Sequence, residues 1–385
     1  MKRLHLTKLR MTVTSVVLLC GAVTVLSIKL WDTRNNKGPG GDLPDQGRET
    51  TTWPVRLFVY PISAFPGTPA PCCTYSPMSG VLSYIDEHPH LSWVVTNPEE
   101  ATHFLLPILG ACKWGEAGDS AATTYISTAL DIVAARWPYL AAHGGRDHIL
   151  DVTWPDNDRC AQRFSAAAGN LRPRLLPFIG LSVNGDSRPG NAGCELQGQD
   201  VLMPSNCHSE SIDGLSPEAK VLAFGPDQSH RNITGVFRGS PHDRRWTIRP
   251  DMIDALVGVP GFIVSAGHVE SSQYEWELYH TVFALCPSAY EQWTTRLFAV
   301  IAYGAIPVVV SDHLRVPFDE VIGASGTLVI IRWHELASLA DILQSMPKEE
   351  ITRRQRALPA LAAAWSYRQN AVEHMVRELA ARTPI

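Results

Sequence analysis

Residues 283–318 constrain the fold of this chain more than any other stretch, because apolar runs there flank a helical pattern. Phe283 to Cys286 is a short apolar run. Arg296 to Tyr303 has helical spacing, and Ile306 to Val310 is apolar without alternation, as in a strand covered on both faces of a parallel sheet. The order of strand, helix and buried strand predicts a βαβ unit.

The residues that flank these elements indicate a ligand site. Thr294-Thr295 precedes the helix with side chains that favour an N-cap, and Gly304 stands where a helix C′ glycine belongs. Ser311-Asp312 follows the second strand at its carboxyl end, where open α/β sheets bind their ligands. A helix N-terminus that faces such a crevice attracts anions. The stretch therefore predicts a nucleotide-binding unit with Arg296 at its mouth.

The same alternation of strands and helices extends over the C-terminal half, from residue 218 to residue 346. Strands are predicted to begin about 20 to 28 residues apart, near Ile233, Gly261, Phe283, Ile306 and Thr327. Helices are predicted between them, at Arg244–Val257, Ser272–Thr281, Thr294–Tyr303 and Trp333–Met346. The pattern predicts a doubly wound parallel sheet with right-handed crossovers. Residues 349–382 predict one or two closing helices with a break at Pro359.

The N-terminal half also has an α/β pattern, with longer loops. Val55 to Tyr60 alternates and is rich in β-forming residues, so it predicts a first strand. A helix is predicted from Ser79 to His88, and residues 97–107 predict a turn, a short helical turn and a buried strand. Tyr125 to Tyr139 has apolar residues at helical spacing, and a further strand runs into Asp151.

The N-terminus predicts a membrane anchor followed by a stem. Residues 1–10 carry Lys2, Arg3, Lys8 and Arg10, and an uncharged run from Met11 to Ile28 follows that is about long enough to span a bilayer. The predicted transmembrane anchor is residues 11–30. Basic residues ahead of such a segment place the N-terminus in the cytosol. Residues 31–52 are rich in Gly, Pro and polar residues, as in a flexible stem. The competing interpretation is a cleaved signal peptide.

Charge and cysteine content exclude some classes of function. The chain has a net charge of −5, and the segment 1–29 contributes five basic and no acidic residues, so the remainder carries −10. An acidic domain of this kind does not indicate binding to nucleic acid. The cysteines outside Cys20 form no CxxC pair, which disfavours a zinc cluster. In an oxidising compartment several of them are expected to pair, with at least one left over, and the sequence leaves the connectivity open.

The stretch 283–318 closely resembles the C-terminal signature of the exostosin family, glycosyltransferase family 47. The matching residues are Cys286-Pro287, Tyr290-Glu291, Arg296-Leu297, Ile301, Gly304, Ile306-Pro307-Val308, Ser311-Asp312 and Pro317-Phe318. Shorter resemblances occur at residues 97–107, 144–151, 200–204 and 236–240. One position departs from the signature, because the acidic residue three positions after the arginine is Ala299 here.

The resemblance implies a GT-B-like α/β fold with two Rossmann-type domains that face a cleft, preceded by a single transmembrane helix. Residues 53–217 would form the acceptor-side domain, residues 218–346 the domain that binds the nucleotide sugar, and residues 347–385 the closing helices. The protein would be a single-pass type II protein of the Golgi membrane with its catalytic domain in the lumen. Whether it forms a homodimer or a heterodimer is left open.

The resemblance also implies the reaction, which is transfer of a sugar from a UDP-sugar donor to a hydroxyl of a glycan acceptor, with inversion. We expect no cofactor and no metal, since Asp156-Asn157-Asp158 has metal-binding spacing but lies in a polar loop. The alternative is a catalytically weak or inactive homologue that binds glycan or supports a partner transferase. The loss of an acidic residue at Ala299 favours that alternative.

The predicted site combines a donor set and candidate bases. The donor-binding residues are Arg238, Gly239, Tyr290, Glu291, Thr294, Thr295, Arg296, Ser311 and Asp312. The candidate catalytic bases on the acceptor side are Asp147, His148 and Asp151. Three of these residues also have a structural interpretation. Asp147 could cap a turn, His148 could be a satisfied half-buried residue, and Arg238 could form a surface salt bridge. The tryptophans Trp93, Trp114, Trp137 and Trp154 could stack on sugars or pack in the core.

Overall fold

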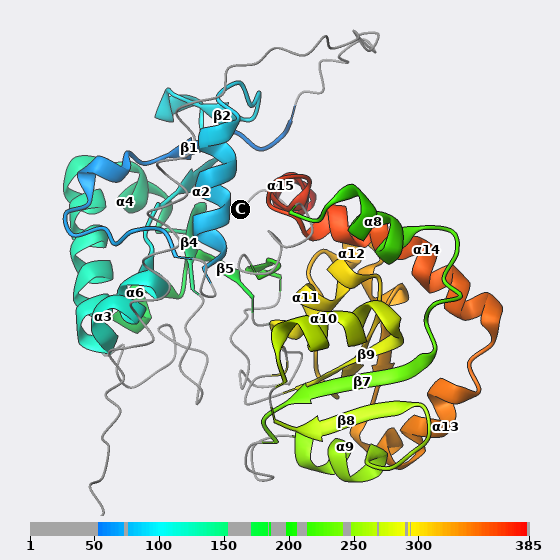
Figure 1. Cartoon of the computed structure of the whole chain (residues 1–385). Coiled ribbons are helices and arrows are strands. Elements are labelled where there is room, and N and C mark those ends of the chain that lie inside the picture. Colours follow the sequence, from blue (N-terminus) through cyan, green and yellow to red (C-terminus); the bar gives the residue numbers. More distant parts are fainter. Residues whose placement is uncertain are drawn as a thin grey trace, which may run out of the picture. The chain divides into compact units, whose positions relative to one another are not determined.

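Two parallel β-sheets, one in each half of the chain, organise the fold of this protein (Figure 1). The computed structural model describes residues 53–72, 76–152, 171–183, 185, 198–205, 214–241, 248–267, 269–288, 292 and 294–382. The predicted anchor and stem lie outside these residues. Within the described part of the chain, no helix is both long enough and apolar enough to cross a bilayer.

The N-terminal sheet has the strand order β2-β1-β3-β4-β5-β6, and every pair is parallel. Its strands are β1 (Leu57–Val59), β2 (Val94–Val95), β3 (His103–Leu105), β4 (His148–Asp151), β5 (Ile179–Ser182) and β6 (Val201–Leu202). The helices around it are α2 (Pro77–Glu87), η2 (Pro98–Glu100), α3 (Gly110–Arg136), α4 (Tyr139–His143) and α6 (Arg172–Leu175). The predicted strands and the short helical turn within residues 97–107 are confirmed.

Helix α3 differs from the sequence prediction in its length. The helix predicted from Tyr125 to Tyr139 is the second part of a segment that begins at Gly110. Gly118 lies within it at φ 79°, a left-handed conformation that glycine adopts without strain, and it kinks the helix there. The long segment carries the chain from the carboxyl end of β3 back toward the amino end of β4.

The C-terminal sheet has the strand order β11-β10-β9-β7-β8, again parallel throughout. All five predicted strands are present: β7 (Ile233–Gly239), β8 (Phe262–Ala266), β9 (Thr281–Pro287), β10 (Ile306–Val310) and β11 (Val329–Ile331). The helical elements are α8 (Pro217–Phe224), α9 (Arg249–Leu256), α10 (Ser271–His280), α11 (Arg296–Ala299), η4 (Val300–Tyr303), α12 (Asp319–Ile322), η5 (Ala324–Gly326), η6 (Trp333–Ser338) and α13 (Leu339–Gln344).

Both faces of the C-terminal sheet are buried, which is why its strands lack alternation. Phe237 and Phe283 join the core cluster that contains Leu256 of α9. Their neighbours Val236 and Ala284 join a second cluster, which contains Leu278 of α10 and Val300 of η4. Because successive strand residues point to opposite faces, helices must cover both sides of the sheet. Figure 1 shows α9 and α10 on either side of β7 and β8.

Both sheets reverse their strand order once. The chain passes from β1 outward to β2 and then returns to place β3 on the other side of β1. In the same way it passes from β7 to β8 and then places β9 on the other side of β7. In open α/β sheets the crevice at the carboxyl ends of such strands is where ligands bind. The topology therefore gives one candidate crevice to each sheet, between β1 and β3 and between β7 and β9.

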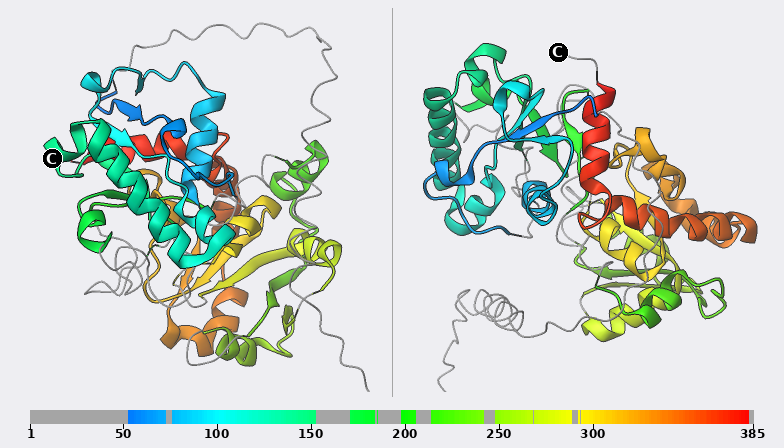
Figure 2. Two further views of the ribbon diagram at one scale, coloured as in Figure 1. Left: turned by 90° about the vertical axis from the view of Figure 1, so that its left-hand side faces the viewer. Right: turned by 90° about the horizontal axis from the view of Figure 1, so that it is seen from above.

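The closing helices are α14 (Lys348–Trp365) and α15 (Ala371–Ala381), and the break between them was predicted wrongly. Pro359 lies inside α14, and the chain leaves the helix at Ser366 instead. Figure 2 shows α14, in orange, and α15, in red, meeting at an angle. A proline removes one helical hydrogen bond. Here the buried neighbours Leu358, Leu361 and Trp365 hold the helix against the core across that position.

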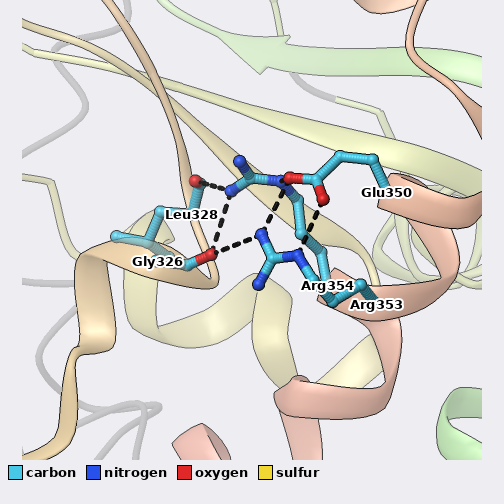
Figure 3. Close-up of polar contacts among 5 residues, drawn as sticks. All are labelled: Gly326, Leu328, Glu350, Arg353 and Arg354. Carbon is cyan, nitrogen blue, oxygen red and sulfur yellow. Dashed lines mark hydrogen bonds and ion pairs between the residues drawn. The ribbon is translucent and has the colours of Figure 1, made fainter.

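The first turns of α14 are held to the loop that precedes β11 (Figure 3). Arg353 donates to the carbonyl oxygen of Gly326 at 3.0 Å, and Arg354 donates to that of Leu328. Both arginines also bind Glu350, at 2.7 and 2.8 Å. The hydrogen bond from Arg353 is the largest cause that lowers the pKa of Glu350 to about 2.

Residues that follow α14 contact the N-terminal sheet. The Tyr367 hydroxyl donates to the carbonyl oxygen of Pro204 at 2.9 Å, and Arg382 donates to that of Asp200 at 2.7 Å. A side chain at Gly80 of α2 would meet the Tyr367 ring at 2.4 Å, so only glycine leaves room for this ring. The described residues between 53 and 382 belong to one compact unit.

Candidate functional site

Arg296 lies at the strand-order reversal of the C-terminal sheet. β7 ends at Gly239, β9 ends at Pro287, and Arg296 begins α11 just beyond β9. Its Nη2 atom donates to the backbone carbonyl oxygen of Arg238 at 2.5 Å. The guanidinium carbon lies 4.4 Å from the centre of the Phe237 ring, a cation–π contact. The structure thus places Arg296 where the sequence predicts a ligand.

One donor atom of Arg296 is left without a partner. Within the part of the chain that the structure describes, its Nη1 atom is buried and makes no hydrogen bond. Nor is an ion pair found for this arginine among the described residues. Leaving a buried donor of a charged group unsatisfied costs about 1–3 kcal/mol or more, and such atoms are uncommon in folded proteins. This arrangement suits an anionic ligand.

Arg238, in contrast, has its charge matched by a protein carboxylate. Its Nε and Nη2 atoms bind Glu277 of α10 at 2.9 and 2.6 Å, and its Nη1 atom donates to Ser265 of β8 at 2.7 Å. Glu277 is buried and the Arg238 side chain is mostly so. The Glu277 hydrogen bonds raise the pKa of Arg238. The pair is therefore a half-buried salt bridge rather than a surface one, and a donor-binding role for Arg238 stays a prediction.

Gly239 supports the site by giving Arg296 room. A β-carbon at this position would lie 2.9 Å from the Arg296 Nη2 atom, closer than real contacts allow. The sequence suggested that this glycine lets the backbone approach a phosphate. In the structure the close neighbour is the arginine itself.

The helix that begins at Arg296 is less regular than predicted. α11 has four residues and continues as the 3-10 helix η4, which ends at Gly304 with φ 70°. Thr294 accepts a hydrogen bond from the Arg296 backbone at 3.4 Å, whereas Thr295 makes no side-chain cap. The predicted C′ glycine is confirmed. Tyr290 and Glu291 lie outside the described residues.

Ser311 and Asp312 follow β10 as predicted, and both bind neighbouring loops. The buried Ser311 hydroxyl donates to Gln292 at 2.7 Å. Asp312 accepts from the backbone nitrogen of Trp333 at 2.8 Å, at the start of η6. These contacts order the carboxyl end of the sheet, and direct contact with a donor stays a prediction for both residues.

Asp147 and His148 lie at the amino end of β4. His148 is fully buried, its Nδ1 lies 2.7 Å from Asp147 and its Nε2 lies 3.0 Å from the Tyr60 hydroxyl. Burial raises the pKa of Asp147, but hydrogen bonds and charges from His148 and His143 outweigh it, so the net shift is downward. Both ring nitrogens of His148 are thus satisfied inside the protein. This geometry favours the structural interpretation, and catalysis by either residue stays a prediction.

Asp151 lies three residues further along the same strand, at its carboxyl end. Its Oδ2 atom accepts from the Ser76 hydroxyl at 2.5 Å, and only 2% of the residue is exposed. Since ligands bind at the carboxyl ends of parallel strands, Asp151 is placed better than Asp147 or His148. The structure therefore separates Asp151 from the Asp147–His148 pair instead of bringing all three candidates together.

The four tryptophans of the sequence analysis lie in different parts of the fold. Trp93 is buried in the core, and Trp137 packs 4.9 Å from the Tyr60 ring. Trp114 is half-buried in the first turns of α3, just beyond the carboxyl end of β3. Trp154 lies outside the described residues. Of the described members of this group, Trp114 is the one near a candidate crevice.

One disulfide and one free thiol are present among the described cysteines. Cys72 is bonded to Cys112, and Cys286 is free and buried in β9. Burial raises the pKa of the Cys286 thiol to about 12, so it is not a reactive thiolate. The sequence predicted that several cysteines pair and that at least one stays free. Among the described cysteines, one pair and one free thiol are found. Among the described residues, no group of three or more His, Cys, Asp or Glu side chains is arranged to hold a metal ion.

Three residues of this site were missed by sequence reasoning. Glu277 neutralises Arg238, Phe237 supports the Arg296 guanidinium, and Tyr274 lies 6.0 Å from it. Phe237 lies within the short resemblance at residues 236–240, and that resemblance could have pointed to it. The other two come from α10 and carry no local pattern.

Comparisons with known proteins identify the family of this chain. Residues 54–346 match the Exostosin GT47 domain. A rice protein named "Probable glucuronosyltransferase GUT1" is 25% identical over 277 residues, which is 68% of this chain and 63% of that protein. An Arabidopsis thaliana protein named "Probable beta-1,4-xylosyltransferase IRX10L" is 26% identical over 292 residues, 71% of this chain and 66% of that protein. The chain thus spans slightly less than two thirds of the length of these relatives.

Among solved structures, Anabaena Alr3699/HepE in complex with UDP aligns with a TM-score of 0.42 and 12% identity, over 85% of this chain and 100% of that one. The stretch 283–318, which carried the predicted resemblance, lies inside the matched range. This chain belongs to the exostosin GT47 family of glycosyltransferases.

Proposed function

We propose that this protein transfers a sugar from a UDP-sugar to a hydroxyl group of a glycan, with inversion at the anomeric carbon and without a metal ion. The observation that carries the proposal is the buried, unpartnered Nη1 atom of Arg296 between the carboxyl ends of β7 and β9. A diphosphate oxygen placed there would satisfy this donor and bring a negative charge beside an arginine that has no carboxylate partner among the described residues.

The reaction needs charge stabilisation on the leaving group. The bond between the anomeric carbon and the UDP oxygen breaks while the acceptor oxygen bonds to the opposite face of that carbon. The acceptor proton passes to a base, and UDP leaves with an added negative charge. Arg296 would stabilise that charge, because Phe237 and the Arg238 carbonyl hold its guanidinium in place before the reaction.

The three predicted candidate bases differ in their position along β4. Asp151 stands at the carboxyl end of β4, whereas Asp147 and His148 stand at the amino end and bind one another. We therefore propose Asp151 as the first candidate to test. Its short contact with Ser76 would have to loosen for it to accept a proton from an acceptor hydroxyl.

The names of the relatives suggest which sugar the donor carries. These include glucuronosyltransferases and β-1,4-xylosyltransferases, so UDP-glucuronic acid and UDP-xylose are the first donors to test. We also propose a type II protein of the Golgi membrane with a luminal catalytic domain, which rests on the basic residues ahead of the uncharged run 11–28.

The second candidate is a homologue that binds glycan or assists a partner without catalysis. It is favoured by Ala299, at the position where the family signature has an acidic residue. A site without that carboxylate would lose a hydrogen-bond acceptor toward the nucleotide. The two candidates differ in one property, which is turnover of a sugar donor.

The test is an assay of the purified full-length chain with UDP-xylose, UDP-glucuronic acid, UDP-galactose and GDP-fucose. Each donor is offered with an oligosaccharide panel that includes xylohexaose, and UDP or GDP release and the extended product are measured. Release with one donor, accompanied by product, would support the active transferase. Absence of nucleotide release and of product with every donor would favour the second candidate. Loss of turnover in EDTA, restored by manganese, would contradict metal independence.

A further inference from the structure

The chain contains a single Asn-x-Ser/Thr triplet, Asn232-Ile233-Thr234, which is the acceptor pattern for N-linked glycosylation. Such triplets also arise by chance, so the position of the asparagine in the fold has to decide. Asn232 immediately precedes β7 and is exposed, whereas Ile233 is buried and Thr234 is half-buried. Among the described residues the Asn232 side chain makes no hydrogen bond, so its amide group is open to solvent.

The backbone at Asn232 is held from both sides. The residue before it, Arg231, is buried and donates to the carbonyl oxygen of Thr281 at 2.6 Å. On the other side, the backbone nitrogen of Thr234 donates to the carbonyl oxygen of Gly261 at 2.8 Å. A group attached to Asn232 would therefore start from a fixed point of the surface.

Asn232 lies at the opposite end of β7 from the proposed donor site. Arg296 binds the carbonyl oxygen of Arg238, which is at the carboxyl end of this strand. The strand has seven residues, and at about 3.3 Å each its two ends are about 20 Å apart. A glycan on Asn232 would thus begin at the end of the sheet away from the donor crevice.

The residues around Asn232 at this end of the sheet are aromatic. In the parallel pairing of β7 with β9, Ile233 is the partner of Thr281, so the residues before them, Asn232 and His280, are neighbours. The ring of His230, two residues ahead of the asparagine, lies 5.8 Å from the His280 ring. The amino end of β7 and the last turn of α10 therefore meet beside the triplet.

The face of β7 that includes this position is the one that α10 covers. Arg238 binds Glu277 of α10, and Val236 shares a buried cluster with Leu278 of the same helix. Alternate residues of a strand point to the same face of a sheet. Continuing this alternation by one residue beyond the strand puts Asn232 on the α10 side as well.

An exposed tryptophan extends this aromatic surface. The His280 ring stacks on Trp276 with 4.1 Å between ring centres, and Trp276 is 53% exposed. The Nδ1 atom of His280 lies 2.7 Å from the carbonyl oxygen of Trp276, which fixes the histidine ring. Among the described residues, Trp276 stacks on no other ring. A broad, fixed aromatic face is a suitable surface for the apolar face of a sugar ring.

We propose that Asn232 is N-glycosylated and that the innermost sugars of this glycan lie over His280 and Trp276. The proposal rests on the luminal location proposed above, and it is independent of which sugar the protein transfers. The linkage forms when the side-chain nitrogen of Asn232 bonds to the anomeric carbon of a lipid-linked oligosaccharide. The bond from that carbon to the lipid diphosphate breaks, the lipid diphosphate leaves, and an amide proton passes to a base of the transferring enzyme.

The test of the modification is the mass of the full-length chain, expressed in human cells in culture, before and after treatment with peptide N-glycosidase F. The wild-type chain should lose the mass of one glycan, and Asn232→Gln should lose none. Thr234→Ala, which keeps the asparagine but breaks the triplet, should also lack the glycan, whereas Thr234→Ser should keep it. Survival of the glycan in Asn232→Gln would overturn the proposal.

Protease protection in intact microsomes separates failure of the proposal from failure of the luminal location. A wild-type chain that is protected but carries no glycan would overturn the modification alone. A chain that is digested from outside the vesicles would contradict the luminal location, and the glycan with it.

Thermal unfolding tests the contact between the glycan and the aromatic surface. Enzymatic removal of the glycan should lower the Tm of the wild type by about 2 °C and leave the Tm of Trp276→Ala unchanged, because that variant lacks the surface beneath the sugars. Trp333→Ala removes a tryptophan of η6 that is 47% exposed, and as the matched control it should lose as much as the wild type. Equal losses in wild type and Trp276→Ala would exclude the contact with Trp276.

Discussion

The Nη2 atom of Arg296 donates a hydrogen bond to the backbone carbonyl oxygen of Arg238 at 2.5 Å, so the backbone of one predicted donor-site arginine holds the other. The two guanidinium groups then differ in their surroundings. That of Arg238 is matched by Glu277, whereas the Nη1 atom of Arg296 has no partner among the described residues. This difference favours Arg296 over Arg238 for the proposed anion-binding role.

Glu277→Gln is expected to destabilise the protein by about 3 kcal/mol, because it leaves the half-buried Arg238 guanidinium without its counter-charge. Urea unfolding monitored by circular dichroism measures the change. The double variant with Arg238→Met should recover part of the loss, since both charged partners are then absent. Equal stability of wild type and Glu277→Gln would show that the ion pair contributes little.

Arg231→Met is expected to lower the free energy of unfolding by about 3 kcal/mol or more, because this buried arginine satisfies several backbone carbonyl groups. Its guanidinium has no carboxylate partner among the described residues, and burial lowers its pKa to about 10. The oxygens that it binds belong to Gln228, Leu278, Thr281, Ala223 and Tyr303. The exposed Arg356→Met is the control for thermal unfolding, and a similar Tm in both variants would contradict the prediction.

The pairing of Cys72 with Cys112 closes a segment with a sequence separation of 40 residues. On a chain-entropy argument, the double substitution to serine should lower the free energy of unfolding by up to about 4 kcal/mol. Guanidinium unfolding of the variant under non-reducing conditions measures this. Reduction of the wild-type protein should produce a shift of the same sign, and an unchanged midpoint in both experiments would show that the cross-link does not stabilise the fold.

Stability is expected to fall between about pH 4.5 and pH 7 through Glu378 in α15. Burial raises the pKa of this carboxyl from 4.5 to about 7, although Arg382 lies 3.7 Å away and Arg315 also opposes the shift, while Glu320 adds to it. A carboxyl with a raised folded-state pKa contributes its full stability below the unfolded value and loses it as the pH rises through the folded value.

The size of the Glu378 effect follows from the shift, and it is up to about 3 kcal/mol. Glu378→Gln should flatten the dependence of Tm on pH across this window, since the amide does not ionise. Thermal unfolding of wild type and variant at several pH values measures the difference. Parallel pH profiles for the two proteins would exclude Glu378 as the responsible group.

The sequence predicted elements whose signal is local. Ile306 to Val310 could be assigned to a buried strand because it lacks alternation, and Gly304 to a helix end because the following strand requires a turn there. Pro359 misled the prediction for a physical reason. The helix-breaking tendency of proline acts locally, whereas the packing of Leu361 and Trp365 holds α14 together.

Contacts between distant residues could not be predicted from sequence. Glu277 is 39 residues from Arg238, and Tyr60 is 88 residues from His148. Such pairs depend on strand register and on which helix covers which face of the sheet. The unpartnered atom of Arg296 is likewise visible only once its neighbours are placed. The family signature pointed to Arg296, and the structure shows that its surroundings differ from those of Arg238.

Binding of UDP to the full-length chain, measured by isothermal titration calorimetry, tests the central claim most directly. Arg296→Ala should raise the Kd for UDP by at least about tenfold, because a charge-assisted hydrogen bond is worth about 1.5–3 kcal/mol. Arg353→Ala, which removes an exposed arginine of α14, should bind as wild type does. A wild-type Kd in Arg296→Ala would contradict the assignment of this arginine to the donor diphosphate.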